Sequence, residues 1–124
     1  MSVPAPAYTY AADLMRVIDG DTFVMRVDLG FRVRIDVEVR LRGVDAPEVT
    51  GASAEAGQVA ARFALVTLTS LLLPSGLVIQ THKGARGGAE RSFTRWVADV
   101  YLPDGRSLAD VMVEAGQARR AEGT

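Results

Sequence analysis

Three aspartates stand at the ends of segments rich in β-forming residues. Asp19 and Asp21 are two positions apart around Gly20, and Asp45 follows a long alternating segment. If folding brings these segments together, the carboxylates repel one another unless a cation lies among them. Carboxylate oxygens, in a chain with no cysteine and a single histidine, favour calcium or magnesium over zinc. Because Asp-Gly is also a common turn signal, the spacing of Asp19 and Asp21 alone is weak evidence for a metal site.

Arg40 and Glu48 flank Asp45 on either side. Hydrolysis of a phosphodiester needs a group that activates water and donors for the charge that develops on the phosphate. Glu48 could be the first, and Arg40 together with a second arginine could be the donors. The spacing alone is more typical of solvated charges at the end of a strand.

The element that would position Arg40 shows strict alternation. Odd-numbered residues from Phe31 to Leu41 are apolar, and even-numbered residues from Arg32 to Arg42 are charged. A period of two predicts a long strand with one face on the core and one in water. Its length suits a strand that coils around a small barrel. Gly43 ends the alternation and predicts a bend before Asp45.

The other elements have shorter signals. Strands are expected over 8–18, 22–28, 77–81 and 94–102, with a reversal at Leu29-Gly30. A helix is expected over 54–73 with Ser53 as its N-cap, and a second from Ser107 to a stop at Gly116. This order predicts an α+β fold: a five-stranded OB-like β-barrel with two packed α-helices. Residues 1–7 would be a loose leader to a single domain over 8–124.

Three ordered segments resemble the staphylococcal nuclease-like (thermonuclease) family. They are Val17-Ile18-Asp19-Gly20-Asp21-Thr22, then Val39-Arg40-Leu41-Arg42-Gly43-Val44-Asp45-Ala46-Pro47-Glu48, and Arg95-Trp96-Val97-Ala98-Asp99-Val100-Tyr101. The helix expected after Ser107 also resembles the one that follows in that family. The resemblance covers the chain from about residue 10 to 119, and the compatible spacing of the segments makes it much more specific than any one of them.

The resemblance implies a calcium-dependent, sugar-nonspecific nuclease that hydrolyses DNA or RNA and leaves 3′-phosphate ends. Asp21 and Asp45 match the carboxylates that bind Ca²⁺, and Ala46 matches the residue that lends a backbone carbonyl. Asp19 matches a position that acts on the ion through water. Glu48 matches the general base, and Arg40 and Arg95 match the arginines that hold the scissile phosphate.

The chain also departs from the family pattern. Arg91-Ser92-Phe93-Thr94 precedes Arg95, where the family commonly has aspartate, tyrosine and glycine. Phe93 is expected to bind substrate by stacking on a base, as aromatic side chains do with single strands. The loop after Glu48 is short, and the family's last helix has no counterpart. A homo-oligomer that covers the exposed flank of the barrel is therefore an expectation as well.

Composition limits the alternatives. The chain has 124 residues, 14 basic and 15 acidic side chains, which argues against a binder that depends on a large basic surface. No segment is long and apolar enough to predict a membrane span, and the first residues lack the pattern of a secretory signal. A cytoplasmic location is thus expected, although relatives are often secreted. The main rival is a non-catalytic OB-type module that binds single-stranded nucleic acid or a protein.

Overall fold

The computed structural model describes residues 2–69, 76–82 and 95–121, without the side chain of Arg95. Its strands are β1 (Thr9–Asp19), β2 (Thr22–Gly30), β3 (Val33–Leu41), β4 (Val44–Asp45), β5 (Leu77–Thr81), β6 (Arg95–Tyr101) and β7 (Arg119–Arg120). Its helices are a 3₁₀ turn, η1 (Gly51–Ser53), and the α-helices α1 (Ala54–Thr69) and α3 (Leu108–Glu114). Residues 2–8 precede β1 without regular structure.

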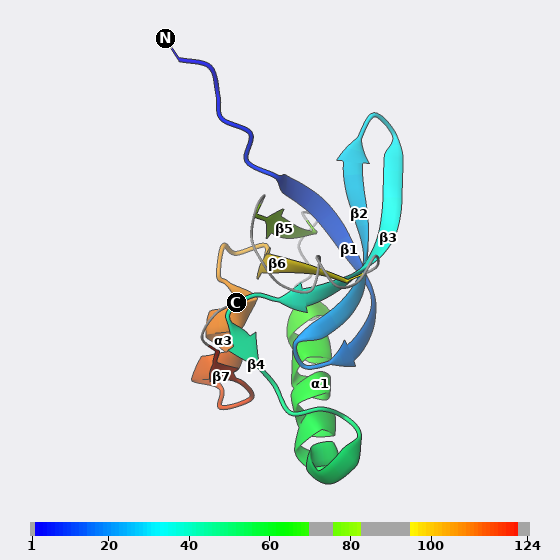
Figure 1. Ribbon diagram of the computed structural model, residues 1–124, viewed down its shortest axis with the longest axis vertical. Coiled ribbons are helices and arrows are strands. Elements are labelled where there is room, and N and C mark those ends of the chain that lie inside the picture. The colour runs from blue at the N-terminus through cyan, green and yellow to red at the C-terminus, as the bar shows by residue number, and fades with distance from the viewer. Residues whose placement is uncertain (1, 70–75, 83–94, 122–124) are drawn as a thin grey trace.

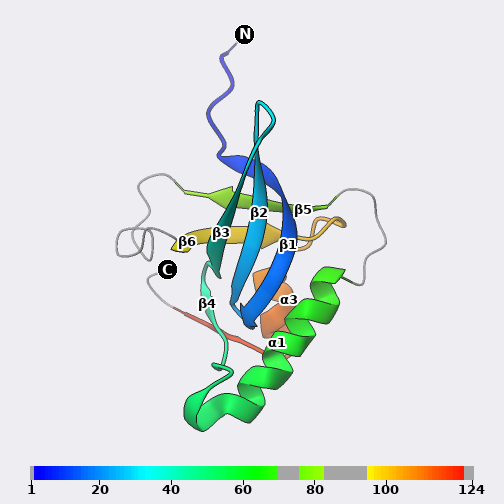
Figure 2. The same cartoon turned by 90° about the vertical axis from the view of Figure 1, so that its right-hand side faces the viewer.

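Five strands close into a barrel in the order β1-β2-β3-β6-β5. Strands β3 and β6 run parallel, and the other neighbours in the barrel are antiparallel. Figures 1 and 2 show α1 towards one end of this barrel and the tip of the β2–β3 hairpin projecting at the other. The predicted α+β fold, an OB-like five-stranded barrel with two helices, is confirmed.

The long first strand closes the barrel by pairing with two neighbours. Its second part pairs with β2, and its first part, Thr9 to Ala12, pairs with β5. Two register irregularities, between Leu14 and Arg16 and between Val17 and Asp19, interrupt the β1–β2 ladder. Such irregularities bend and twist a strand, which lets one strand curl from one neighbour to the next.

The predicted reversal at Leu29-Gly30 was wrong by two residues. Gly30 pairs with Val33, so Phe31 and Arg32 form the hairpin turn, with φ angles of 54° and 62°. Positive φ at both positions defines a turn whose twist matches the flanking strands, although Asn-Gly is the usual sequence for it. The prediction placed the turn at position 30 because glycine is typical of turns, whereas the pairing of the flanking strands determined the actual turn.

The prediction that every odd residue from 31 to 41 faces the core was also wrong at one end. Val39 and Leu41 are fully buried, but Phe31, Val33 and Ile35 are 99, 47 and 42% exposed. The reason is the extent of pairing: β6 covers β3 only from Glu38 to Leu41, and β1 pairs with β2 only as far as Val27. Beyond these residues, none of the other described strands pairs with the β2–β3 hairpin, so the hairpin is not part of the barrel wall.

Both helices cover the core at the end of the barrel near the aspartates. In α1, Gly57, Ala60, Ala64 and Leu68 are buried, a helical spacing of three or four residues. The helix α3 ends as predicted, since Gly116 has φ 74° and the amides of Gly116 and Gln117 donate to Val113 and Met112. Neither β4 nor β7 was predicted. They form a separate two-stranded sheet that ties the segment after α3 to Val44 and Asp45.

Candidate active site

Arg40 is the centre of a partly buried polar cluster at the C-terminal end of β3. Its Nη1 lies 3.0 Å from Oδ2 of Asp21 and donates a 2.9 Å hydrogen bond to the Val44 carbonyl. Its Nη2 pairs with Oδ1 of Asp45. The side chain of Arg40 is only 17% exposed. One guanidinium therefore joins the β1–β2 turn to β4, two segments that are far apart in the sequence.

Asp21 uses both carboxylate oxygens. Oδ2 accepts a 2.8 Å hydrogen bond from the Ala46 amide as well as facing Arg40, and Oδ1 accepts a 2.9 Å bond from the Thr22 hydroxyl. The Leu41 amide also donates to the Asp21 carbonyl at 2.7 Å, which fixes the turn against the end of β3. Ala46 thus contacts Asp21 through its N–H, while its carbonyl is the group that the sequence implicated.

Asp19 holds the loop that carries Glu48. Its Oδ1 accepts a 3.0 Å hydrogen bond from the Val49 amide. The same loop rests against α1 at Gly57, where an added Cβ would lie 1.8 Å from the Glu48 carbonyl oxygen. Because backbone cannot yield at that distance, only glycine allows this approach. Gly57 is therefore a positioning residue that the sequence reasoning missed, and an isolated glycine in an alanine-rich helix was the available signal.

Gly20 has a related role between the two aspartates. A Cβ there would lie 3.0 Å from the Cβ atoms of both Ala46 and Ala60. The turn therefore packs directly on the Asp45-Ala46 segment and on α1. Two glycines, Gly20 and Gly57, thus allow the acidic turn, the loop after β4 and the helix to come together.

A hollow of about 360 Å³ opens beside the cluster, on the side of β4 and β7. Its lining includes Asp45, Ala46 and Pro47 from the loop, and Gln117 and Arg119 from the segment after α3. Arg119 lies opposite Asp45 in the β4–β7 pair. Sequence reasoning missed Arg119, because the pairing of β4 with β7 has no signal in so short a segment.

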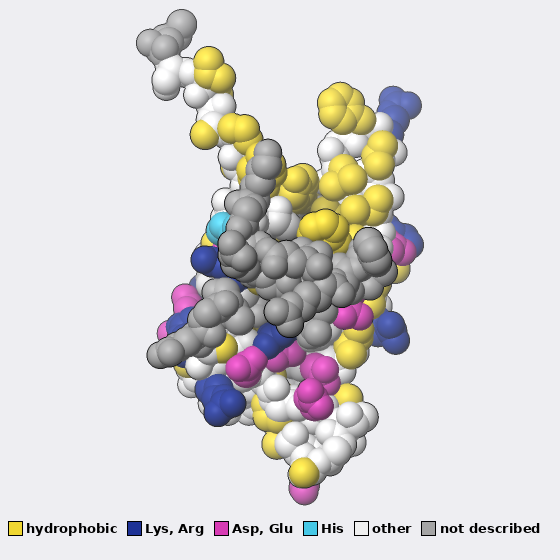
Figure 3. Space-filling model, in the orientation of Figure 1, with side chains coloured by type: hydrophobic (Ala, Val, Ile, Leu, Met, Phe, Trp, Pro, Cys, Tyr) yellow, Lys and Arg dark blue, Asp and Glu magenta, His cyan; other side chains and the backbone are white. Residues whose placement is uncertain are grey.

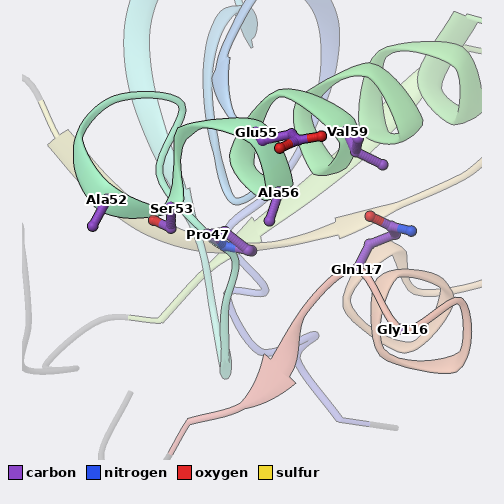
Figure 4. A pocket seen from close by; sticks show the side chains of 8 residues that line it. All are labelled: Pro47, Ala52, Ser53, Glu55, Ala56, Val59, Gly116 and Gln117. Carbon is purple, nitrogen blue, oxygen red and sulfur yellow. The ribbon is translucent and has the colours of Figure 1, made fainter.

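A second hollow, of about 530 Å³, lies on the other side of Pro47. Figure 4 shows Gln117 pointing across it towards Val59, with Glu55 and Ala56 on α1 and Ser53 at the start of the helix. Glu48 is exposed on the loop next to Pro47, which lines both hollows. In the space-filling view, acidic side chains gather around a basic one on the face shown (Figure 3).

The remaining predicted site residues are less completely defined. Arg95 begins β6, and its backbone lies opposite Glu38 of β3, two residues before Arg40. The direction of its side chain, like Phe93 as a whole, lies outside the described residues. His82 was predicted to be a surface residue at a strand end. It follows β5, and its Nε2 lies 2.6 Å from Oδ2 of Asp99 on β6.

The donor chemistry of the cluster fits a hard divalent cation in part. Two carboxylates, Asp21 and Asp45, converge on one guanidinium, which leaves a net charge of −1 on the three groups. Carboxylate oxygens of this kind suit Ca²⁺. In the part of the chain that the structure describes, however, no three acidic or histidine side chains lie close enough to hold a metal ion. Asp21 and Asp45 would be the protein ligands, with water and backbone oxygens completing the shell.

The structure thus brings together Asp21, Arg40, Asp45 and Ala46. Asp19 accepts a hydrogen bond from the Val49 amide, next to Glu48 in the loop. No protein-family model matches the chain, and no curated protein sequence matches it significantly. None of the helices in the described residues is long and apolar enough to span a membrane. Function is therefore inferred from the geometry of the site and from the resemblance in the three segments.

Proposed function

We propose that the chain is a calcium-dependent, sugar-nonspecific nuclease that hydrolyses phosphodiester bonds of DNA or RNA, single strands being the expected form, and leaves 3′-phosphate ends. One observation carries the proposal: Arg40 is held by Asp21, Asp45 and the Val44 carbonyl, and Asp45 lines a hollow that Arg119 also lines. A guanidinium held in this way is oriented before substrate arrives, and little reorganisation is needed when charge develops on a phosphate.

Arg40 would donate hydrogen bonds to the non-bridging oxygens of the scissile phosphate. Its planar group suits two phosphate oxygens at once, which a lysine at this position could not match. Arg95 would be the second donor, from the neighbouring strand. Asp21 and Asp45 would hold the calcium ion, whose positive charge would polarise the phosphate. That charge also offsets the excess of carboxylates, which otherwise repels an anionic substrate.

Glu48 would act as the general base. It would take a proton from a water molecule whose oxygen then bonds to phosphorus, while the bond from phosphorus to the 5′ oxygen breaks and that oxygen takes up a proton. The contacts of Asp19 with Val49 and of Gly57 with the Glu48 backbone keep the loop near the cluster. The exposure of Glu48 leaves its carboxylate accessible to water.

The test is hydrolysis of end-labelled single-stranded DNA and RNA, with Ca²⁺ and with a chelator. The wild type is expected to cut only with Ca²⁺ and to leave 3′-phosphate ends. Glu48→Gln is expected to lose at least about a hundredfold in rate while retaining Ca²⁺ binding by calorimetry. Glu55→Gln is a matched control, because Glu55 is exposed and lines the hollow next to the same loop.

Two outcomes would contradict the proposal. Full activity of Glu48→Gln would exclude Glu48 as the base, and absence of cutting by the wild type at any Ca²⁺ concentration would exclude the nuclease. If the wild type binds labelled strands without cutting them, the protein is instead a binding module of the OB type. Binding and cutting are therefore measured on the same substrates.

A further inference from the structure

The projecting end of β3 is an apolar and charged surface that the proposed function leaves unexplained. Phe31, Val33 and Ile35 lie on the hairpin formed with β2, and Leu29 beside them is 39% exposed. Figure 3 shows apolar side chains gathered along this hairpin. Exposed apolar residues on a protein surface are ordinarily scattered singly. A contiguous apolar patch on a protruding element therefore indicates a binding surface.

The same segment has an exposed strand edge. Among the described strands, none pairs with Val33–Val37 on the side of β3 away from β2, since β6 begins its pairing at Glu38. The Leu41 amide donates to Asp21, on the side of β2, and the Arg42 amide donates to Ala98 of β6. The β2–β3 register is unbroken from Asp28 to Thr22, so this alternation extends along β3. The backbone groups of Arg34 and Asp36 therefore point to the exposed edge.

The sequence of this edge is complementary to itself. In an antiparallel pair centred on Ile35, Ile35 lies opposite Ile35 of the second copy, and Val33 opposite Val37. Arg34 then lies opposite Asp36, and Asp36 opposite Arg34. Opposite charges and apolar pairs across antiparallel strands stabilise a sheet, and like charges destabilise it. The outward backbone groups of Arg34 and Asp36 also come into register, which allows four hydrogen bonds between the copies.

We infer that the edge Val33–Val37 of β3 pairs with the same edge of a second copy, around a two-fold axis at Ile35. This contact buries the apolar face of both hairpins. Val37, which lies opposite Val33 of the other copy, lines a hollow of about 170 Å³ together with Trp96 and Tyr10. A strand edge of this length gives a small interface, so we expect a dissociation constant on the order of 10–100 µM.

The contact leaves the Arg40 cluster open. Arg40 is three residues along the strand from Val37, the nearest residue of the contact, roughly 10 Å at the rise of a β-strand. The dimer and the proposed nuclease are therefore independent, and either can fail without the other.

The experiment uses two single variants, each of which places like charges opposite one another when two identical copies pair. Arg34→Asp places aspartate opposite Asp36 twice, and Asp36→Arg places arginine opposite Arg34 twice. Mixed together, the two variants restore opposite charges at both positions. Sedimentation equilibrium from about 1 µM to 1 mM should show the wild type passing from 13.2 kDa to twice that mass. Each variant alone should stay monomeric, and the equimolar mixture should form a heterodimer within about threefold of wild-type affinity.

Formation of the heterodimer requires both variants to be folded, so unfolding cannot imitate the result. Arg62→Asp, the same charge change at an exposed position of α1, should dimerise like the wild type. The inference is overturned if the wild type is a monomer at 1 mM. It is also overturned if either variant dimerises like the wild type, or if the mixture remains monomeric.

Discussion

The two ends of β3 have the same sequence pattern and opposite environments. At the C-terminal end, Val39 and Leu41 are buried and Arg40 lies in an ion cluster with side-chain exposures of 17% for itself, 9% for Asp21 and 43% for Asp45. At the N-terminal end, Val33 and Ile35 are nearly half exposed and Phe31 almost fully, and Asp36 pairs with Arg26 at 48 and 44% exposure. Alternation thus determines which face a side chain is on. The pairing of β3 with β6 determines whether that face is buried.

The largest expected effect of this difference concerns the two arginines Arg40 and Arg34. Arg40→Ala leaves Asp21 without its cation in a buried position, which is expected to lower the free energy of unfolding by about 3 kcal/mol. It should also reduce hydrolysis at least about a hundredfold, since one preorganised donor is lost. Arg34→Ala should change the unfolding free energy by less than about 0.5 kcal/mol. Urea unfolding measures the free energy of unfolding of both variants. Hydrolysis rates are measured at urea concentrations below the midpoint of unfolding.

A second outcome for Arg40 would change the interpretation. If Arg40→Ala lowers stability but retains full activity, the cluster has only a structural role and the phosphate is held elsewhere. Arg40→Lys separates charge from shape, because it retains the charge but loses the planar group that spans Asp21 and Asp45.

The second prediction compares the same substitution at the two ends of the strand. Val39→Ala removes two methyl groups from a fully buried site and should cost about 2 kcal/mol. Val33→Ala removes them from a side chain that is 47% exposed and should cost less than about 0.5 kcal/mol at concentrations where the protein is monomeric. Urea denaturation at 1 µM measures both. Equal costs would mean that another part of the chain covers the hairpin.

Much of the fold could be predicted because its signals are local. The alternation of 31–42, the turn at Asp19-Gly20-Asp21 and the stop at Gly116 each depend on residues that are adjacent in sequence. The pairing of β4 with β7 and the closure of the barrel by β1 and β5 depend on contacts between distant segments. The sequence therefore predicted which residues alternate, but it could not predict where the barrel ends and the hairpin begins to project.

The candidate site divides in the same way. Asp21, Arg40 and Asp45 could be named from residue type and resemblance, and the structure brings them together. Arg119 could not be named, because its position opposite Asp45 follows from a two-residue strand. Gly57 was missed for a different reason. Glycine in a helix usually lowers stability, and only the approach of the Glu48 backbone explains its presence.

The smallest expected effect is a pH dependence at the exposed end of the strand. The hydrogen bonds from Arg26, 2.8 Å from Nε and 3.1 Å from Nη2, hold the pKa of Asp36 below its usual range. A carboxyl whose pKa is lower in the folded protein than in the unfolded one binds fewer protons when folded. Its contribution to stability is therefore complete above about pH 4, the usual pKa of aspartate, and is lost as the pH falls through the lowered value.

Asp36→Asn should therefore be less stable than the wild type at neutral pH and equal to it in sufficiently acid solution. Salt should weaken the difference, because both side chains are nearly half exposed and their charges are screened. Urea unfolding at a protein concentration of 1 µM, from pH 7 downward with and without 1 M salt, measures this. If the difference persisted unchanged at low pH, its cause would be packing of the hairpin rather than the charge on Asp36. The contrast between the two ends of β3 would then concern shape more than electrostatics.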